Sequence, residues 1–582
     1  MRPMTDAAGD YTPDGLKQRL VRLAEGLKRH RHDWEEHYKE LAEFVLPRRG
    51  RWDNQSTHHR GKMLNRRILN STGTLALRTL QSGMQTGITS PARPWFRLIP
   101  ADYELRNHGA IKAYTNDVER ILRQYFQSTG AYNSLHTGYG DLGLYGTDCA
   151  ILEPHPRQGF ILHQLVPGEF WVGANDDNMI DTLYHETWMT VEQIVGRFVY
   201  GGSRHAQPQW GRATSTIKNL WDKGQRNELI LVSRYIAPRY NRDPVRLTDD
   251  NKPVMSVWWE QGSSGDQVLR NSGYDINPII ASRWFKTGME VYGRSPGMDA
   301  LPDIKALQTQ ERDKGEAIQR MNRPPMNAPT AMRNTPFSLM PGAVNFTDIE
   351  RGMFPAYEIN PPVQELREDI RETEDRVNQA FYADLFLMMS RLDRRQITAR
   401  EVDERSEEKL IGLGPVLELQ HREKLRPLIM NAFTILDRAG LLPEPPAELD
   451  GRDMQIDYIS MLAQAQKAVS TGGVERLAGF IGNMAAVKPT VLDKIDEDEA
   501  VEEYADMLGT PARIVRPQDE VDALRQERAE QEAQQAQLDA ASQAAPAARE
   551  GAQAAQILAD ASEPRGEQPG DVLRRIGLRG GT

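Results

Sequence analysis

The sequence predicts an α+β fold, in which a mixed N-terminal half is followed by long helices. Three observations predict it. Apolar residues recur at helical spacing near the start, short β-like runs lie between about Ala150 and Phe285, and three long helical patterns follow residue 295. At 582 residues the chain exceeds the size at which a single core keeps growing, so we expect several structural units.

The first helix is predicted from HDWEEHYKELAEFVLP. Trp34, Tyr38 and Leu41 recur at three- and four-residue steps, and Pro47 stops the pattern. Basic residues cluster after it, at Arg48, Arg49, Arg51, Lys62, Arg66 and Arg67. A contact with DNA or RNA is one interpretation of this cluster. A solvated face or an ion-pair surface between subunits is the interpretation that we favour.

Turns and then strands are expected next. Gly83, Gly87, Pro91 and Pro94 predict a turn-rich segment in SGMQTGITSPARPWFRL, and NDVERILRQYFQS predicts a helix. The predicted strands are FILHQLV, FWVGAND, LILVSRYIAP, VMSVWWEQ and PIIASRWF, which are rich in Val, Ile, Trp and Tyr. One helical insert, TVEQIVGRF, opens with Thr190 as a predicted N-cap.

Two helices with narrow apolar seams are predicted, one on each side of a non-helical segment at residues 324–362. The first lies within residues 291–323, where Ser295 can cap it and Pro296 suits its first turn. Its apolar stripe is Ile304, Leu307, Ile318 and Met321. The second lies within residues 363–385, and its seam includes Val363, Leu366, Ile370 and Val377. Because such seams cannot fill a large core, we expect each to pack on one partner helix or on neighbouring subunits.

A third long helical pattern spans residues 398–440. Pro415 lies in it beside Gly412 and Gly414, and because proline lacks the backbone donor and crowds the preceding turn, we predict a kink there. Smaller helices are expected in residues 441–515. The Ala-, Gln- and Glu-rich residues 516–582 can form helix but have little to bury, which leaves a solvated helix, a bundle between copies or disorder open.

Common catalytic motifs are missing from the sequence. It has no GxxxxGK[ST] phosphate loop and no GxSxG elbow, and HETWM, with His185 and Glu186, lacks the second histidine of a zincin helix. Carboxylates of residues 363–382 alternate with arginines, as in paired surface charge. The one cysteine, Cys149, excludes an internal disulfide. We therefore expect no catalytic residue, no metal and no cofactor.

Charge and hydropathy limit the partners. A net charge of −10 argues against a protein that grips nucleic acid by neutralising phosphates, but it suits a wall past which DNA slides. No stretch approaches the ~20 apolar residues of a membrane span, and the start lacks the order of a signal peptide. We expect a protein made in the cytoplasm, without a membrane partner.

Three blocks resemble the bacteriophage portal family, in particular the head-to-tail connectors of short-tailed phages. They are ITAREVDERSEEKLIGLGPVLELQ with FTILDRAGLLP, YGRSPGMDALPDIKALQ, and SGMQTGITSPARPWFRL. The resemblance implies a structural subunit of a twelve-copy ring at one capsid vertex of the virion. It also implies a channel for packaging and ejecting double-stranded DNA. The implied partners are other copies, DNA, terminase, tail adaptors, and capsid and scaffolding proteins.

The resemblance also implies an order of parts along the chain. They are a wing (1–290), a stem helix (291–323), a clip (324–362), a returning stem helix (363–385), a tunnel loop (386–397), a kinked wing helix (398–440), a crown (441–515) and a helical barrel or disordered tail (516–582). Arg391, Arg394 and Arg395 are then candidates for phosphate contact in the tunnel loop; without the resemblance, they are better explained as ion-paired residues of a helix connection. A non-channel tail or scaffold protein and a DNA-packaging enzyme are the alternatives.

Overall fold

The computed structural model describes most of the first 460 residues and little of the rest. It describes residues 15–52, 65–102, 104–202, 207–243, 245–324, 326–327, 330, 354–355, 362–392, 403–449, 451–462, 498, 516, 521–536, 553 and 556. The chain divides into two compact units. Unit 1 is Met1–Ile99, Thr115–Pro445 and Met454–Gly509, and unit 2 is Pro100–Tyr114, Pro446–Asp453 and Thr510–Thr582.

Two antiparallel sheets form the centre of unit 1. The larger has the order β4-β5-β6-β7-β8, with β4 (Phe170–Ala174), β5 (Ile180–Thr190), β6 (Leu229–Pro238), β7 (Val254–Glu260) and β8 (Arg270–Tyr274). The smaller has the order β3-β2-β9, with β2 (Thr147–His155), β3 (Gly159–Gln164) and β9 (Ile279–Arg283). All five predicted strands are confirmed; β2, β5 and β8 were not predicted.

A buried core joins the two sheets. Val172, Leu183 and Ile236 are cross-strand partners in one row, so their side chains share a face of the larger sheet. They lie in one cluster with Cys149 and Ala281 of the smaller sheet. Cys149 is thus a buried apolar residue, and burial raises the pKa of its thiol.

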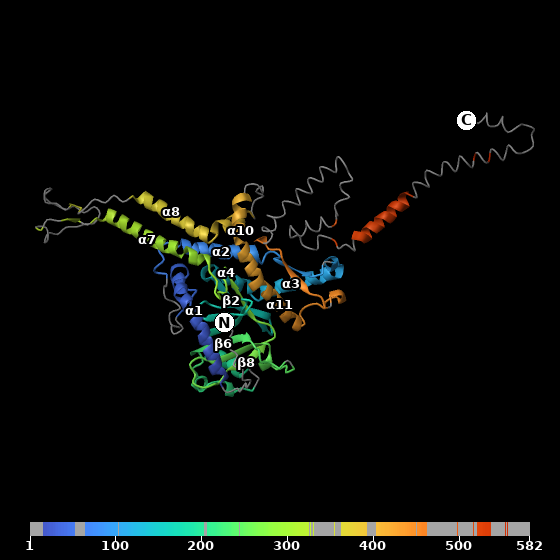
Figure 1. Cartoon of the computed structure of the whole chain (residues 1–582), viewed down its shortest axis with the longest axis horizontal. Coiled ribbons are helices and arrows are strands. Elements are labelled where there is room, and N and C mark those ends of the chain that lie inside the picture. Colours follow the sequence, from blue (N-terminus) through green and yellow to red (C-terminus); the bar gives the residue numbers. More distant parts are fainter. Residues whose placement is uncertain are drawn as a thin grey trace, which may run out of the picture. The chain divides into compact units, whose positions relative to one another are not determined.

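Helix α1 (Leu16–Val45) covers the other face of the larger sheet. The neighbouring row of partners, Trp171, Tyr184 and Tyr235, points to that face because successive side chains of a strand alternate. This row packs in one cluster with Leu20 of α1, and Figure 1 shows α1 running beside the sheet. The predicted helix and its end before Pro47 are confirmed.

Shorter helices complete this part of unit 1. They are α2 (Thr72–Ile88), α3 (Gly109–Ser128, which begins in unit 2), α4 (Ala131–Tyr145), α5 (Val191–Ile194) and α6 (Ser215–Asp222). The predicted cap at Thr190 is confirmed, since its hydroxyl accepts from the Gln193 backbone N–H while the Gln193 side chain accepts from the Thr190 backbone N–H.

The turn-rich segment begins later in the chain than we predicted. Gly83 and Gly87 lie inside α2, and the turn is confined to residues 89–94. A Cβ atom at Gly83 would overlap the ring of Phe386, and one at Gly87 would lie 2.7 Å from Leu462 Cδ1. The two glycines therefore allow other chain segments to approach the helix closely.

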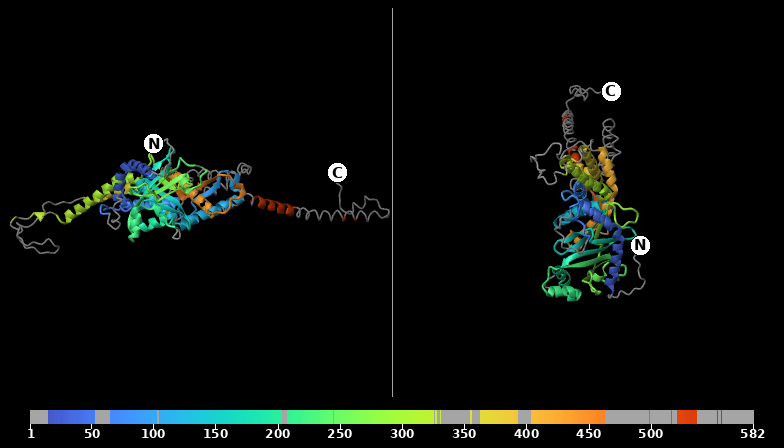
Figure 2. Two further views of the ribbon diagram at one scale, coloured as in Figure 1. Left: turned by 90° about the horizontal axis from the view of Figure 1, so that it is seen from below. Right: turned by 90° about the vertical axis from the view of Figure 1, so that its left-hand side faces the viewer.

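Long helices follow β9. They are α7 (Pro296–Asn322), α8 (Val363–Ala380), α9 (Ala383–Leu392), α10 (Asp403–Gln420) and α11 (Arg426–Arg438), with a π-helical turn at His421–Leu425. Helices α7 and α8 lie side by side in both Figure 1 and Figure 2. Between them, the described residues form one short antiparallel pair, β10 (Met326–Asn327) with β11 (Phe354–Pro355).

Two predictions for this half need adjustment, and a third stays a prediction. Residues 386–392, expected to open a loop, are helical in α9. Residues 454–458, expected to be at the start of small helices, form strand β12 (Met454–Tyr458), which pairs with β1 (Phe96–Pro100). Helix α10 continues through Pro415, and the chain first leaves α geometry at His421–Leu425. The kink at Gly412, Gly414 and Pro415 stays a prediction.

The described part of unit 2 is small. It contains short 3-10 turns at Glu104–Asn107 and Ala447–Leu449, and residues 521–536 are helical. Arg452 forms an ion pair with Asp102 at 2.6 Å, and the Ala101 backbone N–H donates to the Asp453 carbonyl. These contacts join two stretches that are far apart in the sequence.

Candidate functional site: the α7–α8 helix pair

The backbone at the N-terminal end of α7 packs directly against the backbone of the turn between α4 and β2. Gly146 ends α4 with a φ of 75°, and its carbonyl accepts from the Trp284 backbone N–H at 2.9 Å. A Cβ at Gly146 would overlap the Gly293 carbonyl, and a Cβ at Gly297 would lie 2.9 Å from the Leu144 carbonyl oxygen. Only glycine lets these two backbones meet.

Ser295 fixes the first turn of α7 to the same place. Its hydroxyl donates to the Leu144 carbonyl at 2.7 Å and accepts from the Met298 backbone N–H at 3.1 Å. Pro296 occupies the first helical position, where its missing N–H costs nothing. The predicted cap and start of this helix are confirmed, and they anchor the helix to the C-terminal end of α4.

A polar clasp before α2 holds both helices of the pair. The buried Gln308 of α7 accepts from the backbone N–H groups of Leu69 and Asn70 at 2.6 and 2.9 Å and donates to the Asn70 carbonyl at 3.0 Å. The Asn70 side chain then donates to Glu374 of α8 at 2.8 Å. One residue outside the pair thus links its two members.

Direct polar contacts set the register between α7 and α8. Gln310 donates to Asp369 at 2.6 Å and to Thr373 at 3.3 Å. Arg376 forms an ion pair with Asp303 of α7 at 3.3 Å and with Glu372 of its own helix at 3.5 Å. For Arg376, the expected pairing of surface charges on this helix is confirmed.

Burial divides the pair into an inner and an outer part. In the inner part, Ile304, Leu307, Ile370 and Val377 are buried, each at most 5% exposed. The outer part comprises residues 309–322 and 363–369, all of them described, and none of its residues is buried. The stripe and seam positions in the outer part, Ile318, Met321, Val363 and Leu366, are partly or fully exposed, with Met321 45% exposed. Among the residues that the structure describes, the predicted seam is therefore buried only in its inner part.

Helix α9 packs tightly beneath α2. Phe381, Leu385 and Phe386 are buried, and Tyr382, with a φ of 54°, turns the chain between α8 and α9. Arg391 lies in the last turn of α9, but its side chain is not among those described. Arg394 and Arg395, the other two predicted phosphate contacts, lie outside the described residues.

Two buried ion pairs fix the π-helical turn to the smaller sheet. Arg283 of β9 is fully buried and donates to both carboxylate oxygens of Glu423, at 3.1 and 2.5 Å, and to the Asn178 side chain at 2.9 Å. Lys424 donates to Asp148 of β2 at 2.5 Å. The π turn lets the adjacent residues Glu423 and Lys424 both face the sheet.

Sequence reasoning missed these pairs. Glu423 and Lys424 resemble ordinary helix-surface charges, and their partners lie 140 and 276 residues away along the chain. The available signal was the location of Arg283 and Asp148, each inside or beside an apolar, strand-like run. A charge in a run that is otherwise buried requires a partner.

Part of the basic cluster after α1 is paired within the chain. Arg49 binds Asp141 through two hydrogen bonds of 2.7 and 2.5 Å, and Arg51 forms an ion pair with Glu169. Both carboxylates are buried. Three interpretations of the cluster were given: nucleic-acid contact, a solvated face and an ion-pair surface between subunits. For Arg49 and Arg51 the structure shows ion pairs with buried carboxylates of the same chain instead. Lys62 lies outside the described residues.

HETWM is part of a strand rather than a metal-binding helix. His185 and Glu186 lie in β5, and Lys28 forms an ion pair with Glu186 at 2.6 Å. Burial, with Arg234 nearby, lowers the pKa of His185 to about 3, so this imidazole is neutral. Both residues are part of the packed sheet.

A family model described as bacteriophage head to tail connecting protein matches residues 17–515. The chain belongs to this family. Two curated relatives are similar over most of their length. The "Probable portal protein" of Bordetella phage BPP-1 is 39% identical over 517 residues, 88% of this chain and 91% of the relative. The "Portal protein" of Salmonella phage epsilon15 is 38% identical over 535 residues, 91% of this chain and 94% of the relative.

Membership in the connector family assigns the chain a structural role. It is a portal-type subunit of the phage head-to-tail connector and a component of the virion, and it is not an enzyme. Within the described residues, no helix combines the length and the apolar character that crossing a membrane requires.

Proposed function

We propose that this chain forms a twelve-copy ring at one capsid vertex and that double-stranded DNA is packaged and ejected through its channel. In this proposal α7 and α8 are the stem, residues 324–362 are the clip on which terminase docks, and residues 1–290 are the wing. Tail adaptors, capsid and scaffolding proteins are the other partners. The net charge of −10 suits a channel wall that does not hold the phosphates passing it.

The observation that carries the proposal is the outer part of the helix pair. Ile318, Met321, Val363 and Leu366 form a thin apolar row that neither helix covers within one chain. Each such side chain gains roughly 1.5–3 kcal/mol when it is fully removed from water. Neighbouring copies arranged in a ring would supply that cover along the whole circumference.

Leu366→Asp is expected to abolish ring assembly. The substitution places a charge where the proposed neighbour packs, and desolvating that charge without a partner costs several kcal/mol at every interface of the ring. Mass photometry of the wild type should give a mass near twelve times 65.9 kDa. The variant should give mostly single chains.

Gln364→Asp is the matched control, because Gln364 is exposed on the same helix and receives the same charge. It should assemble like the wild type. If Leu366→Asp also assembles normally, the outer part does not carry the ring contact, and the stem assignment fails.

We also propose that Arg391, Arg394 and Arg395 line a tunnel loop and touch DNA phosphates. One observation supports this proposal: Arg391 lies in the last turn of α9, Arg394 and Arg395 follow that helix in the sequence, and α9 packs against α2 and α8. The double variant Arg394→Ala with Arg395→Ala should form normal rings, because the ring contacts of this proposal lie in the stem. It should package or retain less DNA, measured as nuclease-protected DNA per particle. Unchanged packaging would remove the tunnel-loop assignment.

A further inference from the structure

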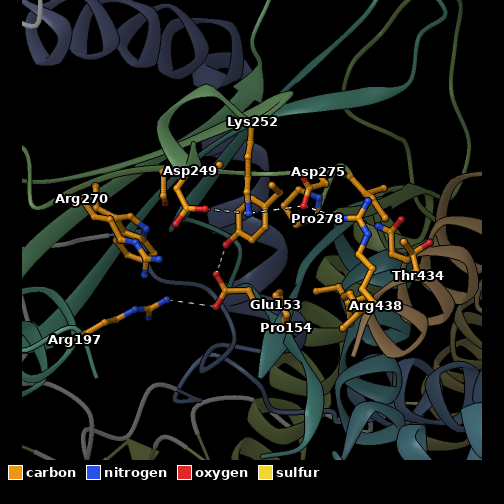
Figure 3. A pocket seen from close by; sticks show the side chains of 18 residues that line it. Glu153, Pro154, Arg197, Asp249, Lys252, Arg270, Asp275, Pro278, Thr434 and Arg438 are labelled. Carbon is orange, nitrogen blue, oxygen red and sulfur yellow. Dashed lines mark hydrogen bonds and ion pairs between the residues drawn. The ribbon is translucent and has the colours of Figure 1, made fainter. Parts of the chain in front are cut away.

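A half-open hollow lies between the two sheets and α11, away from the helix pair. It has a volume of about 340 Å³, and Figure 3 shows the side chains that line it. Strands β7 and β8, strand β2 and helix α11 contribute its walls. This volume is at the lower end of the range for small-molecule sites, roughly 300–1,000 Å³, and would hold on the order of ten waters.

Positive charge exceeds negative charge around this hollow. Its lining contains four cationic side chains, Arg197, Lys252, Arg270 and Arg438, and three carboxylates, Glu153, Asp249 and Asp275. The buried Arg234 lies directly behind them and adds a fifth cation. A positive hollow is not a by-product of composition, because the chain as a whole is acidic.

Every one of the three carboxylates already has a cation. Asp249 pairs with Lys252 at 3.1 Å, and Asp275 pairs with Arg438 at 2.6 Å. One oxygen of Glu153 accepts from Arg234 at 2.6 Å and from the Tyr274 hydroxyl at 2.7 Å. Burial would raise the pKa of Glu153, but the neighbouring arginines hold it at about 2. The Glu153 carboxylate is thus ionised at neutral pH, and it is already bound by Arg234 and Tyr274.

Two arginines keep donor capacity toward the hollow. Arg197 reaches the second oxygen of Glu153 only at 3.4 Å, and its guanidinium lies over the Trp258 ring at 4.7 Å, which orients it. Arg270 forms no ion pair and no side-chain hydrogen bond with any residue that the structure describes. Figure 3 shows Arg197 and Arg270 on one side of the hollow and Arg438 and Thr434 on the opposite side.

We propose that this hollow binds a phosphate group through Arg197 and Arg270. Guanidinium groups present paired N–H donors that match the oxygens of a phosphate, and a multiply charged anion offsets the excess positive charge. The remaining volume accepts the group to which the phosphate is attached. The phosphate is either free, as inorganic phosphate or a small phosphorylated molecule, or part of a DNA backbone.

The test uses the full-length protein in chloride buffer of constant ionic strength, into which sodium phosphate is titrated. The expected result is a saturable rise of the thermal unfolding midpoint. Arg197→Gln and Arg270→Gln should each weaken the apparent affinity for phosphate at least about tenfold, because each removes a charge-assisted contact. Arg22→Gln, which removes an exposed arginine of α1, is the control and should leave the affinity unchanged.

A second arm measures binding of a short DNA duplex to the same variants. If Arg270→Gln weakens phosphate binding but not duplex binding, the ligand is a free phosphate; if it weakens both, the ligand is a backbone phosphate. Absence of a saturable phosphate effect, or equal phosphate affinity in the wild type and both hollow variants, overturns the proposal. Arg270 is exposed, so its variant should have the wild-type unfolding midpoint in chloride alone.

Discussion

Gly146→Ala is expected to destabilise the protein by about 3 kcal/mol or more. Gly146 has a φ of 75°, a conformation that costs an L-residue roughly 1–2 kcal/mol. The new Cβ would also overlap the Gly293 carbonyl group, whose carbon would lie 2.6 Å away. The Cβ position is fixed by the backbone of residue 146, and the atoms that it meets are backbone atoms, so no side-chain rotation relieves the overlap. Overpacking of this kind adds roughly 1–3 kcal/mol. Urea unfolding followed by tryptophan fluorescence measures the loss.

Gly130→Ala separates the two causes. Gly130 has a φ of 71°, nearly the same as Gly146, but no atom lies within 4 Å of a Cβ placed there. It should lose only the conformational part, roughly 1–2 kcal/mol. Equal losses in the two variants would show that the close approach of Gly146 and Gly293 does not constrain the root of α7.

Arg283→Met is expected to cost roughly 3–5 kcal/mol of unfolding free energy. The substitution leaves Glu423 buried, with Lys286 at 3.8 Å as its remaining ion-pair partner among the described residues. Removal of one member of a buried pair is costly chiefly because the other charge stays in a poorly solvated place. The same urea experiment measures the loss. The midpoint should fall without a change in slope.

Two further variants identify the cause of that loss. Arg283→Met combined with Glu423→Met removes both charges and should recover much of the stability. Arg320→Gln breaks an exposed pair with Glu316 and should change the free energy of unfolding by less than about 1 kcal/mol. A double variant as unstable as Arg283→Met alone would mean that shape, rather than the unpaired charge, dominates.

Local signals in the sequence were sufficient to predict an element where its start and its cap depend only on neighbouring residues. The Thr190 cap and the Ser295–Pro296 start use contacts within one turn, so both could be predicted. Gly83 was misinterpreted because glycine in a sequence is typical of a turn, whereas here it accommodates Phe386, which lies about 300 residues away in the sequence. No local pattern contains that contact.

The helix pair could be predicted from the sequence, but its division into a buried inner part and an exposed outer part could not. Apolar spacing identified the seam, yet Ile370 and Leu366 are equivalent in the sequence pattern, whereas in the structure Ile370 is buried and Leu366 is partly exposed. The hollow beside α11 could not be predicted at all, since its walls come from four separate strands and helices.

The π turn at His421–Leu425 also determines how α11 is rotated about its axis relative to α10. One residue advances an α-helix by about 100°, so the extra residue accommodated in the π turn turns the following helix by that amount relative to α10. With this offset, Leu428, Ile429, Ala432 and Leu436 of α11 are buried. A chain one residue shorter at this point would present a different side of α11 to the sheets. The number of residues in this turn therefore determines which side of α11 is buried.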